Sequence, residues 1–332
     1  MPDRVSILIP AFNAEKWIKQ TIDSALHQTW GSKEIIVIDD GSTDRTLVIT
    51  KTFETDSVNV VSQNNCGAAS ARNRALRLAS GDYIQWLDAD DLLAPDKIAG
   101  QMKAAAAERS KFILYSSPYG VFYFRHKRAR FAPNPLWQDL SPVDWMVMNL
   151  ADKLWMNPAG WLVSRELTEK ARPWDERLTI DDDGEYFARI VAASERVKFV
   201  REARCFYRQS GFQQLSKKIS AKTRDSLLLS TTLRIRTLLS LEDSEKARKA
   251  SLAFLQARLP IFYPEHKEDL RQMNAMALTL GGALTPPRLG LRAGLLQMLL
   301  GPKKGKEIMI ILRRLKMAAA VRWDKLMYKL GR

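Results

Sequence analysis

Four short apolar runs set the pattern of the first ninety residues. They cover residues 5–9, 34–39, 58–62 and 83–87, and β-branched or aromatic residues fill them, as in strands that are buried on both faces. Between the runs, apolar residues recur every three or four positions, which predicts three intervening helices. Strands that alternate with helices in this way predict an α/β fold with a doubly wound, mostly parallel sheet.

A few single residues predict where these elements begin and end. Pro10 is expected to stop the first strand, and Asn13 to cap the helix that follows. Ser42 or Thr43 is expected to cap the second helix, which runs to about residue 53. The third helix covers residues 67–79 and closes at Gly81, where a positive φ is easiest for glycine.

The pattern changes after a fourth helix near residues 96–109. Residues 111–117 and 120–125 predict two strands that could form a hairpin, and residues 134–158, rich in Trp and Pro, are expected to be irregular. The remaining predicted elements are short strands at 159–164, 197–200 and 204–207 and helices at 165–171, 184–194, 227–241 and 246–259.

The basic charge of the chain is concentrated in its last third. The 332 residues carry a net charge of +15, of which +2 falls on residues 1–219 and +13 on residues 220–332. This asymmetry indicates a C-terminal region that meets an anionic surface, either lipid headgroups or nucleic acid.

Cysteine content and hydropathy narrow the class of protein. Cys66 and Cys205 are the two cysteines, and neither has a His/Cys cluster near it, so a zinc site or a disulfide framework is not expected. Residues 5–12 are too short an apolar run for a signal peptide, and no stretch reaches the ~18 apolar residues of a spanning helix. We therefore expect a cytoplasmic protein.

Three carboxylates follow the fourth strand, within residues 81–91. If strand geometry persists, Asp88 and Asp90 point to the same side, with Asp91 beside them. Hard oxygen ligands at the carboxyl end of a strand suit Mg²⁺ or Mn²⁺, with substrate phosphates completing the shell. The alternative is a solvated acidic turn before the helix that Pro95 and Asp96 open.

Four motifs together resemble family 2 glycosyltransferases of the GT-A fold. They are residues 5–13 (VSILIPAFN), 38–44 (IDDGSTD), 65–73 (NCGAASARN) and 87–91 (LDADD), and the resemblance extends over about residues 4–216. It implies an enzyme that takes a nucleotide-sugar donor, uses a divalent cation, Mg²⁺ or Mn²⁺, and inverts the anomeric centre. A nucleotide-sugar site needs a flat surface for the base, an acceptor for its N–H and a cation for the diphosphate.

The resemblance assigns a donor site and a metal site. Phe12 would stack on the base, or else pack on the first helix. Asp40 would accept a hydrogen bond from the imide N–H of the base. Arg72 would approach the diphosphate, and the alternative is an arginine exposed on the helix. The predicted donor-site residues are Pro10, Ala11, Phe12, Asn13, Asp40, Arg72, Asp88 and Arg208. The predicted metal ligands are Asp90 and Asp88, with Asp91 in support.

A second acidic segment supplies the predicted catalytic base. Residues 174–178 and 181–189 resemble the family segment that ends in a Glu-Asp pair, which places the base at Asp183, or at Asp182 if the register shifts by one. Crowded carboxylates raise one another's pKa, which suits proton acceptance near neutral pH, although acidic residues are also favoured at any helix N-terminus. Trp137, Trp155 and Trp161 could line an acceptor cleft.

The basic region divides the chain in the predicted organisation. Residues 1–219 form the catalytic domain, with a nucleotide-sugar half at 1–110 and an acceptor half at 111–219, and residues 220–332 form a basic helical region. From residue 286 onward, apolar and basic residues alternate, with Trp323 and Tyr328 among them. This pattern favours amphipathic helices on an anionic membrane, and the alternative is a charged bundle packed on the catalytic domain.

These observations predict a metal-dependent, inverting glycosyltransferase. It would use a UDP- or dTDP-sugar and a saccharide or lipid-linked acceptor of the cell envelope, peripheral to the inner face of the membrane. A nucleotidyltransferase is the alternative enzyme, but no Gly-rich phosphate loop with a Lys follows the first strand. A non-catalytic nucleotide- or nucleic-acid-binding protein is the other alternative; the basic region favours it, but no nucleic-acid-binding motif accompanies that region, and no nucleic acid partner is expected.

Overall fold

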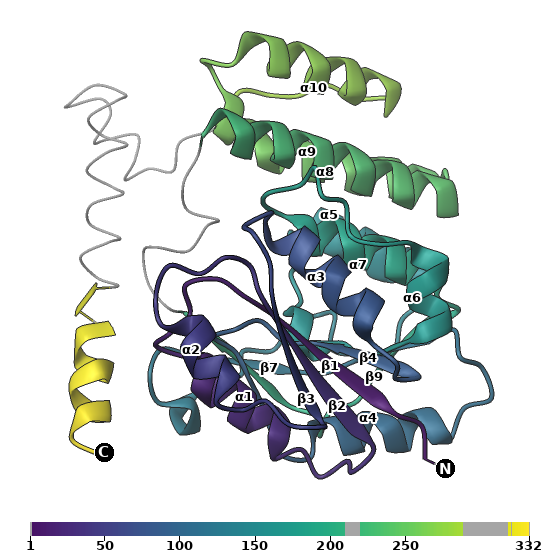
Figure 1. The fold of residues 1–332 in the computed structure, drawn as a ribbon. Helices are drawn as coiled ribbons and strands as arrows, with labels where there is room; N and C mark the ends of the chain where they lie inside the picture. The colour runs from purple at the N-terminus through teal and green to yellow at the C-terminus, as the bar shows by residue number, and fades with distance from the viewer. Residues whose placement is uncertain (1, 210–219, 288–317, 320, 332) are drawn as a thin grey trace.

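The central sheet confirms the predicted α/β architecture. The computed structural model describes residues 2–209, 220–287, 318–319 and 321–331. The strands β1 (Val5–Ala11), β2 (Lys33–Asp39), β3 (Val58–Ser62), β4 (Tyr83–Trp86) and β8 (Val163–Ser164) form one sheet in the order β3-β2-β1-β4-β8. The first four are parallel (Figure 1). Strand β8 is antiparallel to β4.

Two hydrophobic cores lie on the two faces of this sheet. Alternate residues of each strand point to opposite faces, so Ile7 and Ile9 of β1 belong to one core and Leu8 to the other. Helices α1 (Ile18–Leu26) and α4 (Lys97–Ala106) pack in the first core, and α3 (Ala68–Leu78) packs in the second. Helix α2 (Thr46–Lys51) lies beside α1.

The first strand continues through Pro10, contrary to prediction. The carbonyl of Leu8 accepts a hydrogen bond from the Leu87 N–H, so even-numbered residues of β1 direct their backbone groups toward β4. The pairing with β4 ends at Leu8 and Trp86. The missing N–H of Pro10 therefore falls where β1 has no neighbour on that side, and it costs no ladder hydrogen bond.

The predicted helix caps are wrong, because the capping residues bind each other. The Asn13 Oδ1 accepts a hydrogen bond from the Thr43 N–H at 2.8 Å, and the Ser42 Oγ accepts one from the Asn13 N–H at 3.0 Å. The first turn of α2 is held instead by Asp44, whose Oδ1 accepts from the Thr46 N–H at 2.9 Å. These contacts tie the loop after β1 to the loop after β2.

Gly81 is required for close packing rather than for a positive φ. It is absent from the glycines with positive φ among the described residues. A Cβ at this position would lie 2.6 Å from the Ser6 Oγ and 2.8 Å from the Arg4 carbonyl oxygen. The glycine therefore lets the start of β4 approach β1.

The strands after α4 pair differently from the predicted hairpin. Strand β6 (Ile113–Ser116) is parallel to β9 (Arg196–Phe199), and β7 (Tyr119–Phe122) is parallel to β10 (Cys205–Arg208). Strand β5 (Leu92–Leu93) lies on the other edge of β10. The short connection between β6 and β7 thus joins strands of two different sheets.

The stretch predicted to be irregular contains helix α5 (Pro142–Ala151). The Ser141 Oγ accepts from the Asp144 N–H at 3.1 Å, and Pro142 occupies the first helical position, which is a strong helix start. The remaining elements of this region are η1 (His126–Arg128), η2 (Pro158–Gly160), α6 (Arg165–Ala171) and α7 (Asp182–Ala193).

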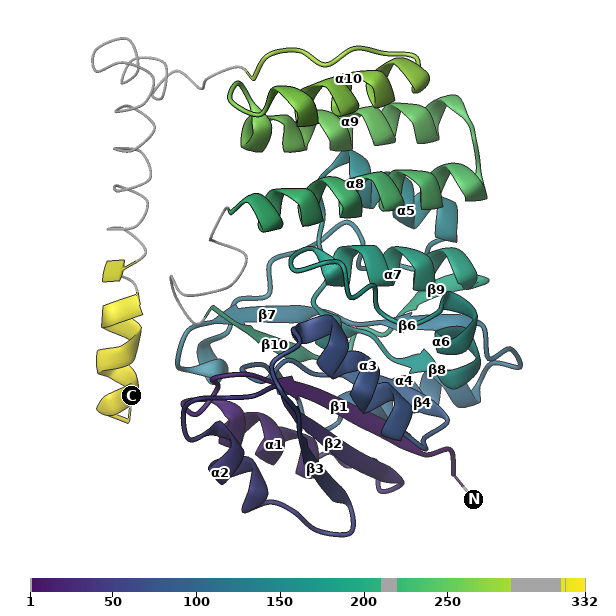
Figure 2. The same cartoon turned by 45° about the horizontal axis from the view of Figure 1, so that its top comes forward.

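Three C-terminal helices extend the core beyond the sheet. They are α8 (Ala221–Leu241), α9 (Glu245–Phe262) and α10 (Lys267–Thr279), and α8 packs on α7, α9 on α5 and α8, and α10 on α9 (Figures 1 and 2). Leu238 and Phe254 belong to the same hydrophobic cluster as Trp86 of β4. Residues 321–329 form a further helix, the C-terminal helix, while residues 288–317 of the predicted membrane-contact segment, which was expected from residue 286 onward, lie outside the described residues.

Candidate active site

The loops that follow β1 and β2 bring the predicted base-binding residues to one edge of the sheet. Ala11 is buried in β1, and its carbonyl accepts from the Asp40 N–H at 2.8 Å. Phe12 follows with 44% of its surface exposed. Pro10 and Asn13 flank these two residues. An exposed ring beside the carboxyl end of the sheet is compatible with the predicted stacking role.

The Asp40 carboxylate organises the segment that leads into α3. Its Oδ1 accepts from the Cys66 N–H at 3.0 Å and from the Gln63 amide at 2.7 Å, and its Oδ2 accepts from the Gly67 N–H at 2.8 Å. A carboxylate offers about four acceptor positions, so these three bonds leave room for one more. Contact with a base is thus a prediction that this geometry permits.

The acidic turn, Asp88–Asp91, does not continue the strand. Strand β4 ends at Trp86, and the Asp91 N–H bonds back to the Asp88 carbonyl at 3.0 Å, so strand geometry does not persist to Asp88 and Asp90. Asp91 is completely buried: its Oδ1 accepts from the Arg208 N–H at 2.8 Å and its Oδ2 from the Asn157 amide at 2.7 Å. Asp91 therefore holds the turn, and Asp88 and Asp90 are its partly exposed carboxylates.

Arg208 holds the same turn from inside the protein. Its guanidinium is fully buried between the rings of Trp17 and Phe122, at 4.1 and 4.4 Å from their centroids. It donates to the Asp90 carbonyl at 2.7 Å and to the Gln20 Oε1 at 2.7 Å. These contacts position the acidic turn, and the predicted contact of Arg208 with a diphosphate gains no support from them.

Arg72 joins the acidic turn to the second acidic segment. Its Nη2 lies 2.8 Å from the Asp88 Oδ1, and its Nη1 lies 2.6 Å from the Asp182 Oδ2. The guanidinium is also 4.4 Å from the ring centroid of Trp174, and the residue is 7% exposed. Arg72 is therefore not an exposed helix arginine. It brings Asp88 and Asp182 to one site, although they come from the turn after β4 and from α7.

Asp183 lies next to Asp182 in the first turn of α7. Its Oδ2 accepts from the Trp155 indole N–H at 2.9 Å, and its Oδ1 accepts from the Gly184 N–H at 2.8 Å. Burial, followed by the negative charges of Asp182 and Asp181, raises the pKa of Asp183 to about 6. A carboxylate with this pKa is largely charged at neutral pH and still basic enough to accept a proton.

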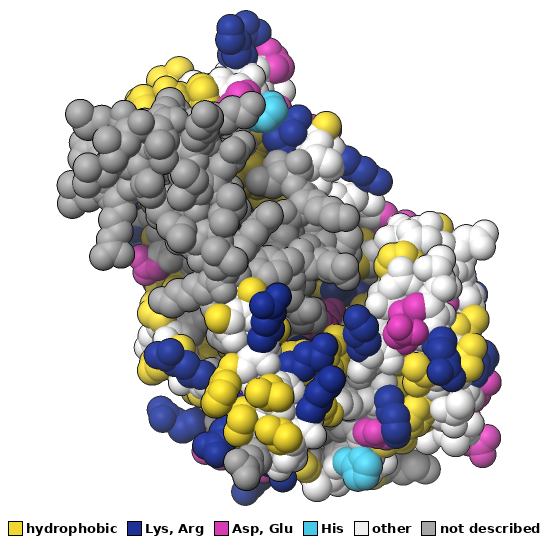
Figure 3. Space-filling model, turned by 90° about the vertical axis from the view of Figure 1, so that its left-hand side faces the viewer, with side chains coloured by type: hydrophobic (Ala, Val, Ile, Leu, Met, Phe, Trp, Pro, Cys, Tyr) yellow, Lys and Arg dark blue, Asp and Glu magenta, His cyan; other side chains and the backbone are white. Residues whose placement is uncertain are grey.

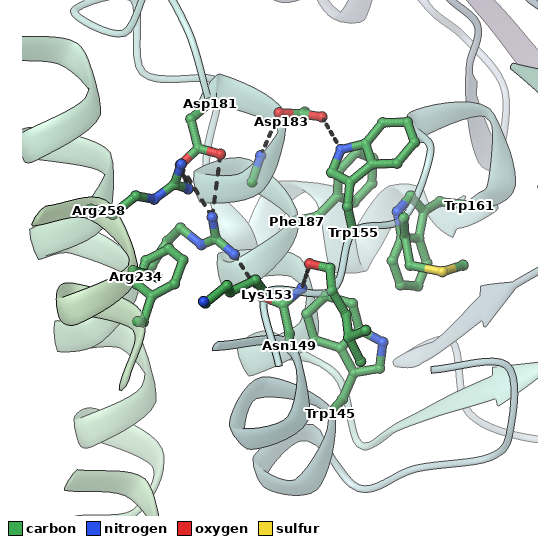
Figure 4. Close-up of a pocket in the computed structure, with 15 residues that line it drawn as sticks. Trp145, Asn149, Lys153, Trp155, Trp161, Asp181, Asp183, Phe187, Arg234 and Arg258 are labelled. Atoms are coloured by element: carbon green, nitrogen blue, oxygen red, sulfur yellow. Dashed lines mark hydrogen bonds and ion pairs between the residues drawn. The ribbon is translucent and has the colours of Figure 1, made fainter. Parts of the chain in front are cut away.

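A pocket of about 290 Å³ opens beside Asp183 (Figure 4). Asp181, the residue before α7, lies in its wall and contacts Arg234 at 3.1 Å and Arg258 at 3.0 Å. Burial would raise the pKa of Asp181, but the two arginines hold it below its usual value. The helices α8 and α9, which supply these arginines, therefore form part of the site.

The carboxylates of the acidic turn fit a divalent cation that shares its shell with a substrate. Among the described residues, no group of three or more His, Cys, Asp or Glu side chains is placed to hold a metal ion. Mg²⁺ is usually bound through one or two carboxylates, with water and substrate phosphates as the other ligands. Asp88 and Asp90 meet that requirement.

Sequence reasoning missed the arginines and one of the amides of this site. Arg234 and Arg258 had no local signal, because a single basic residue on a helix resembles a solvated face. Asn157 gave none either, since its bond to Asp91 spans 66 residues. Trp155 was expected at an acceptor cleft, and it lines the pocket together with Trp161, whereas Trp137 stacks on Phe199.

The C-terminal helix touches the outer end of the same network. The Asp324 carboxylate accepts from the Arg125 Nε at 2.7 Å, and the Tyr328 hydroxyl accepts from the Gln20 amide at 3.1 Å. Gln20 is also a partner of Arg208. A chain of contacts thus runs from this helix to the acidic turn.

Comparison with known proteins agrees with the motifs. Residues 6–143 match the model of glycosyl transferase family 2. The chain is 42% identical over 116 residues to the UDP-Glc:alpha-D-GlcNAc-diphosphoundecaprenol beta-1,3-glucosyltransferase WfaP of Escherichia coli, which covers 35% of this chain and 46% of that protein. It is 41% identical over 119 residues to the chondroitin synthase of Pasteurella multocida, covering 35% of this chain and 12% of that protein. The chain thus spans less than half the length of these relatives.

Solved structures extend the likeness to the whole fold. The structure of residues 1–349 of S. aureus TarS in complex with UDP has a TM-score of 0.64 and 16% identity, and covers 99% of this chain and 92% of that chain. The complex of the same protein with UDP-GlcNAc has a TM-score of 0.63. The likeness in fold agrees with the predicted GT-A-type sheet and its helical C-terminal region, and residues 6–143 carry the similarity to glycosyl transferase family 2.

Proposed function

We propose that this protein transfers a sugar from a UDP-sugar to an acceptor used in cell-envelope polysaccharide synthesis. The observation that carries the proposal is the pair of contacts made by Arg72, which unites the acidic turn with the second acidic segment at the carboxyl edge of the sheet. Ligands bind at that edge in open α/β sheets. The family match and the UDP-sugar named for the E. coli relative support the donor class.

The donor diphosphate would lie between the acidic turn and Arg72. A divalent cation held by Asp88 and Asp90 would neutralise the charge that develops on the departing nucleoside diphosphate. Arg72 is buried, and its Nη2 lies 2.8 Å from the Asp88 Oδ1, so its positive charge lies beside the proposed cation and diphosphate. The exposed ring of Phe12 and the carboxylate of Asp40 would hold the uracil base.

Asp183 would remove the proton from the acceptor hydroxyl. It lies on the pocket side of the acidic segment, whereas Asp182 is already paired with Arg72. Attack by the deprotonated hydroxyl on the face opposite the diphosphate would invert the anomeric centre. The Trp155 indole fixes the orientation of the carboxylate.

The test compares Asp183→Asn with Glu195→Gln, an exposed carboxylate just beyond the other end of α7. Transfer from a panel of UDP-sugars to extracted lipid-linked acceptors, and UDP binding, are measured for each. Asp183→Asn should abolish transfer and leave UDP affinity within about threefold, while Glu195→Gln behaves as the wild type. Transfer that survives in Asp183→Asn and disappears in Asp182→Asn would move the base by one residue. A loss of UDP binding in Asp183→Asn as large as its loss of transfer would place Asp183 in the donor site.

The C-terminal helix supports contact with an anionic membrane. Trp323, Leu326 and Leu330 are 62%, 50% and 59% exposed, and their spacing puts them on one face of the helix. Arg322, Lys325 and Lys329 are exposed as well. Figure 3 shows hydrophobic side chains gathered beside Lys and Arg on this side of the molecule. Apolar groups flanked by cations suit the boundary between acyl chains and anionic headgroups. No helix in the described ranges is long and apolar enough to span a membrane.

A further inference from the structure

The pocket beside Asp183 is built from parts of the chain that lie far apart. The segment between α5 and η2 supplies Lys153 and Trp155, the start of α7 supplies Asp181 and Asp183, and Arg234 and Arg258 come from α8 and α9. Figure 4 shows Asp181 with its two arginines on one side and Asp183 with Trp155 on the other. A volume of about 290 Å³ is near the lower limit for small-ligand sites, so the pocket suits one compact group such as a single sugar residue.

Hydrogen-bond donors in this pocket outnumber their partners. The Nε atoms of Arg234 and Arg258 and the indole N–H groups of Trp145 and Trp161 are buried and have no partner within the described part of the chain. No acceptor atom of a pocket-lining residue is in that condition there. Buried polar groups are almost always satisfied, so the wall of this pocket holds donors that an oxygen-rich ligand could satisfy if the side chains turned toward it.

The cationic side chains of the pocket, like its unpaired donors, favour a ligand that carries negative charge. Lys153, Arg234 and Arg258 are cationic and face the carboxylates of Asp181 and Asp183. Both Nη atoms of Arg234 have partners, Asp181 and Asn149. Arg258 uses one Nη for Asp181. Lys153 makes no hydrogen bond or ion pair within the described residues. Lys153 and part of Arg258 therefore remain to bind an anion.

The backbone on both sides of the pocket is held in an unfavourable conformation. Lys153 has a φ of 56°, which is uncommon for a residue other than glycine or asparagine. Asp181 also has a φ of 56°, and Ser230, Arg234 and Arg258 fix its side chain. Backbone strain persists where surrounding contacts enforce it, and it is concentrated at ligand sites.

We propose that this pocket is the acceptor subsite and that it selects an acceptor whose sugar carries an oxyanion, either a carboxylate or a phosphate. The inference rests on the proposed function, because only a transferase has an acceptor. Lys153 and Arg258 bind the oxyanion, the indole of Trp155 packs against the sugar, and the hydroxyl to be glycosylated faces Asp183. Helices α8 and α9 thus determine which acceptor binds, in addition to supporting the fold.

The experiment compares Arg258→Gln and Lys153→Gln with Lys249→Gln, which removes an exposed cation from α9 outside the pocket. Three probe acceptors are used with the full chain: a phenyl β-hexoside, the corresponding phenyl β-uronoside and the hexose 1-phosphate. Ligand-observed NMR measures binding without a donor, and initial rates with UDP-sugar measure transfer. The wild type should bind and use one of the anionic probes at least tenfold better than the neutral hexoside, and which anionic probe prevails separates carboxylate from phosphate.

The variants decide which side chains carry the preference. A hydrogen bond to a charged group has an energy equivalent to about a tenfold to hundredfold change in binding, so Arg258→Gln should lower kcat/KM for the preferred anion by that factor more than it lowers kcat/KM for the neutral probe. Equal loss for neutral and anionic probes, or no preference in the wild type, overturns the inference. If no UDP-sugar is turned over, the proposed function fails, while the NMR comparison still tests the anion preference.

Discussion

Arg72 and Asp182 lie 110 positions apart in the chain and form an ion pair with 2.6 Å between the Nη1 and the Oδ2. The same guanidinium binds Asp88 at 2.8 Å and stacks on Trp174. Breaking a buried pair by removing one partner leaves an uncompensated charge, which costs about 3–5 kcal/mol. Arg72 thus serves both the fold and the site.

Arg72→Met should therefore reduce both the stability and the rate of transfer. We expect a loss of about 3–5 kcal/mol in the free energy of unfolding and at least a hundredfold fall in kcat/KM. Arg72→Lys keeps the charge but not the two-pronged geometry, so it should recover part of the stability and little of the rate. Denaturant unfolding and initial rates measure these effects. Arg77→Met, an exposed position on α3, is the control; a rate as high in Arg72→Met as in that control would contradict the assignment.

The pH profile of transfer should report the raised pKa of Asp183. A base acts in its charged form, so kcat/KM should fall as the pH drops through about 6 and should be constant above it. Besides burial, the groups that set the pKa of Asp183 are Asp182, Asp181, Trp155 and Arg72. The other charged residues that line the same pocket are Lys153, Arg234 and Arg258.

The acidic limb of the profile is the pH range in which kcat/KM falls. Trp155→Phe should move this limb upward by about one pH unit. It removes a hydrogen bond that stabilises the charged form, so the pKa rises further. Trp137→Phe changes an indole that does not contact Asp183 and should leave the limb where it is. Identical profiles for both variants would exclude Asp183 as the group that titrates.

Asp90→Asn should leave the fold intact and remove most of the activity. Asparagine keeps the shape of the side chain but lacks the charge that a divalent cation requires. Chelation of the wild type should have the same effect, and addition of Mg²⁺ or Mn²⁺ should reverse it. Asp96→Asn, at an exposed carboxylate that makes no capping hydrogen bond, serves as the control. Full activity of the wild type in excess chelator would contradict the metal site.

The sequence pattern predicted the parallel sheet well, because buried strands must be apolar on both faces. Residues 58–62 were predicted as a strand and match β3, and residues 165–171 match α6. Local capping rules failed at Asn13 and Thr43, because their partners lie about 30 residues away and are brought near only by the sheet. Helix α5 was missed since apolar residues are spread round it and give no clear stripe.

The chemistry of the site was predictable in its residue types and less so in its geometry. Asp88, Asp182 and Arg72 were named from motifs, but nothing in their local sequence indicates that Arg72 joins the other two. Asp91 was taken for a supporting metal ligand, and its burial became visible only with Arg208 and Asn157 around it. Long-range hydrogen bonds of this kind are decided by tertiary packing, which a residue pattern does not record.

Lys97 should make stability depend on pH in the alkaline range. It is fully buried in α4, where its ammonium donates to the Gln85 Oε1 and, at 3.1 Å, to the Trp161 carbonyl. Burial lowers its pKa to about 7. Between pH 7 and the unfolded value of about 10.4, the unfolded chain binds more protons, so stability should rise by up to about 1.4 kcal/mol per pH unit.

Lys97→Met should abolish this slope. Denaturant unfolding at pH 7, 8 and 9 gives the comparison, and the difference between wild type and variant cancels the other groups that titrate there. Lys249→Met changes an exposed lysine and should preserve the slope. Parallel stability curves for the wild type and Lys97→Met would mean that this lysine keeps its charge in the folded protein.

The C-terminal helix should bind anionic vesicles through its exposed face. Each Lys or Arg near such a surface contributes about 1 kcal/mol, and the burial of Trp323, Leu326 and Leu330 adds an apolar term that salt does not screen. Full-length protein should co-sediment with phosphatidylglycerol vesicles, less so at high salt, and weakly with neutral vesicles.

Replacement of the three apolar residues by Ser should release it, whereas Leu278→Ser, which alters a 71% exposed leucine on α10, should not. Because Asp324 and Tyr328 keep their contacts with Arg125 and Gln20 in the triple variant, hydrolysis of a soluble UDP-sugar should continue at the wild-type rate. Sedimentation that is indifferent to lipid charge, or unchanged in the triple variant, would show that this face does not meet the membrane.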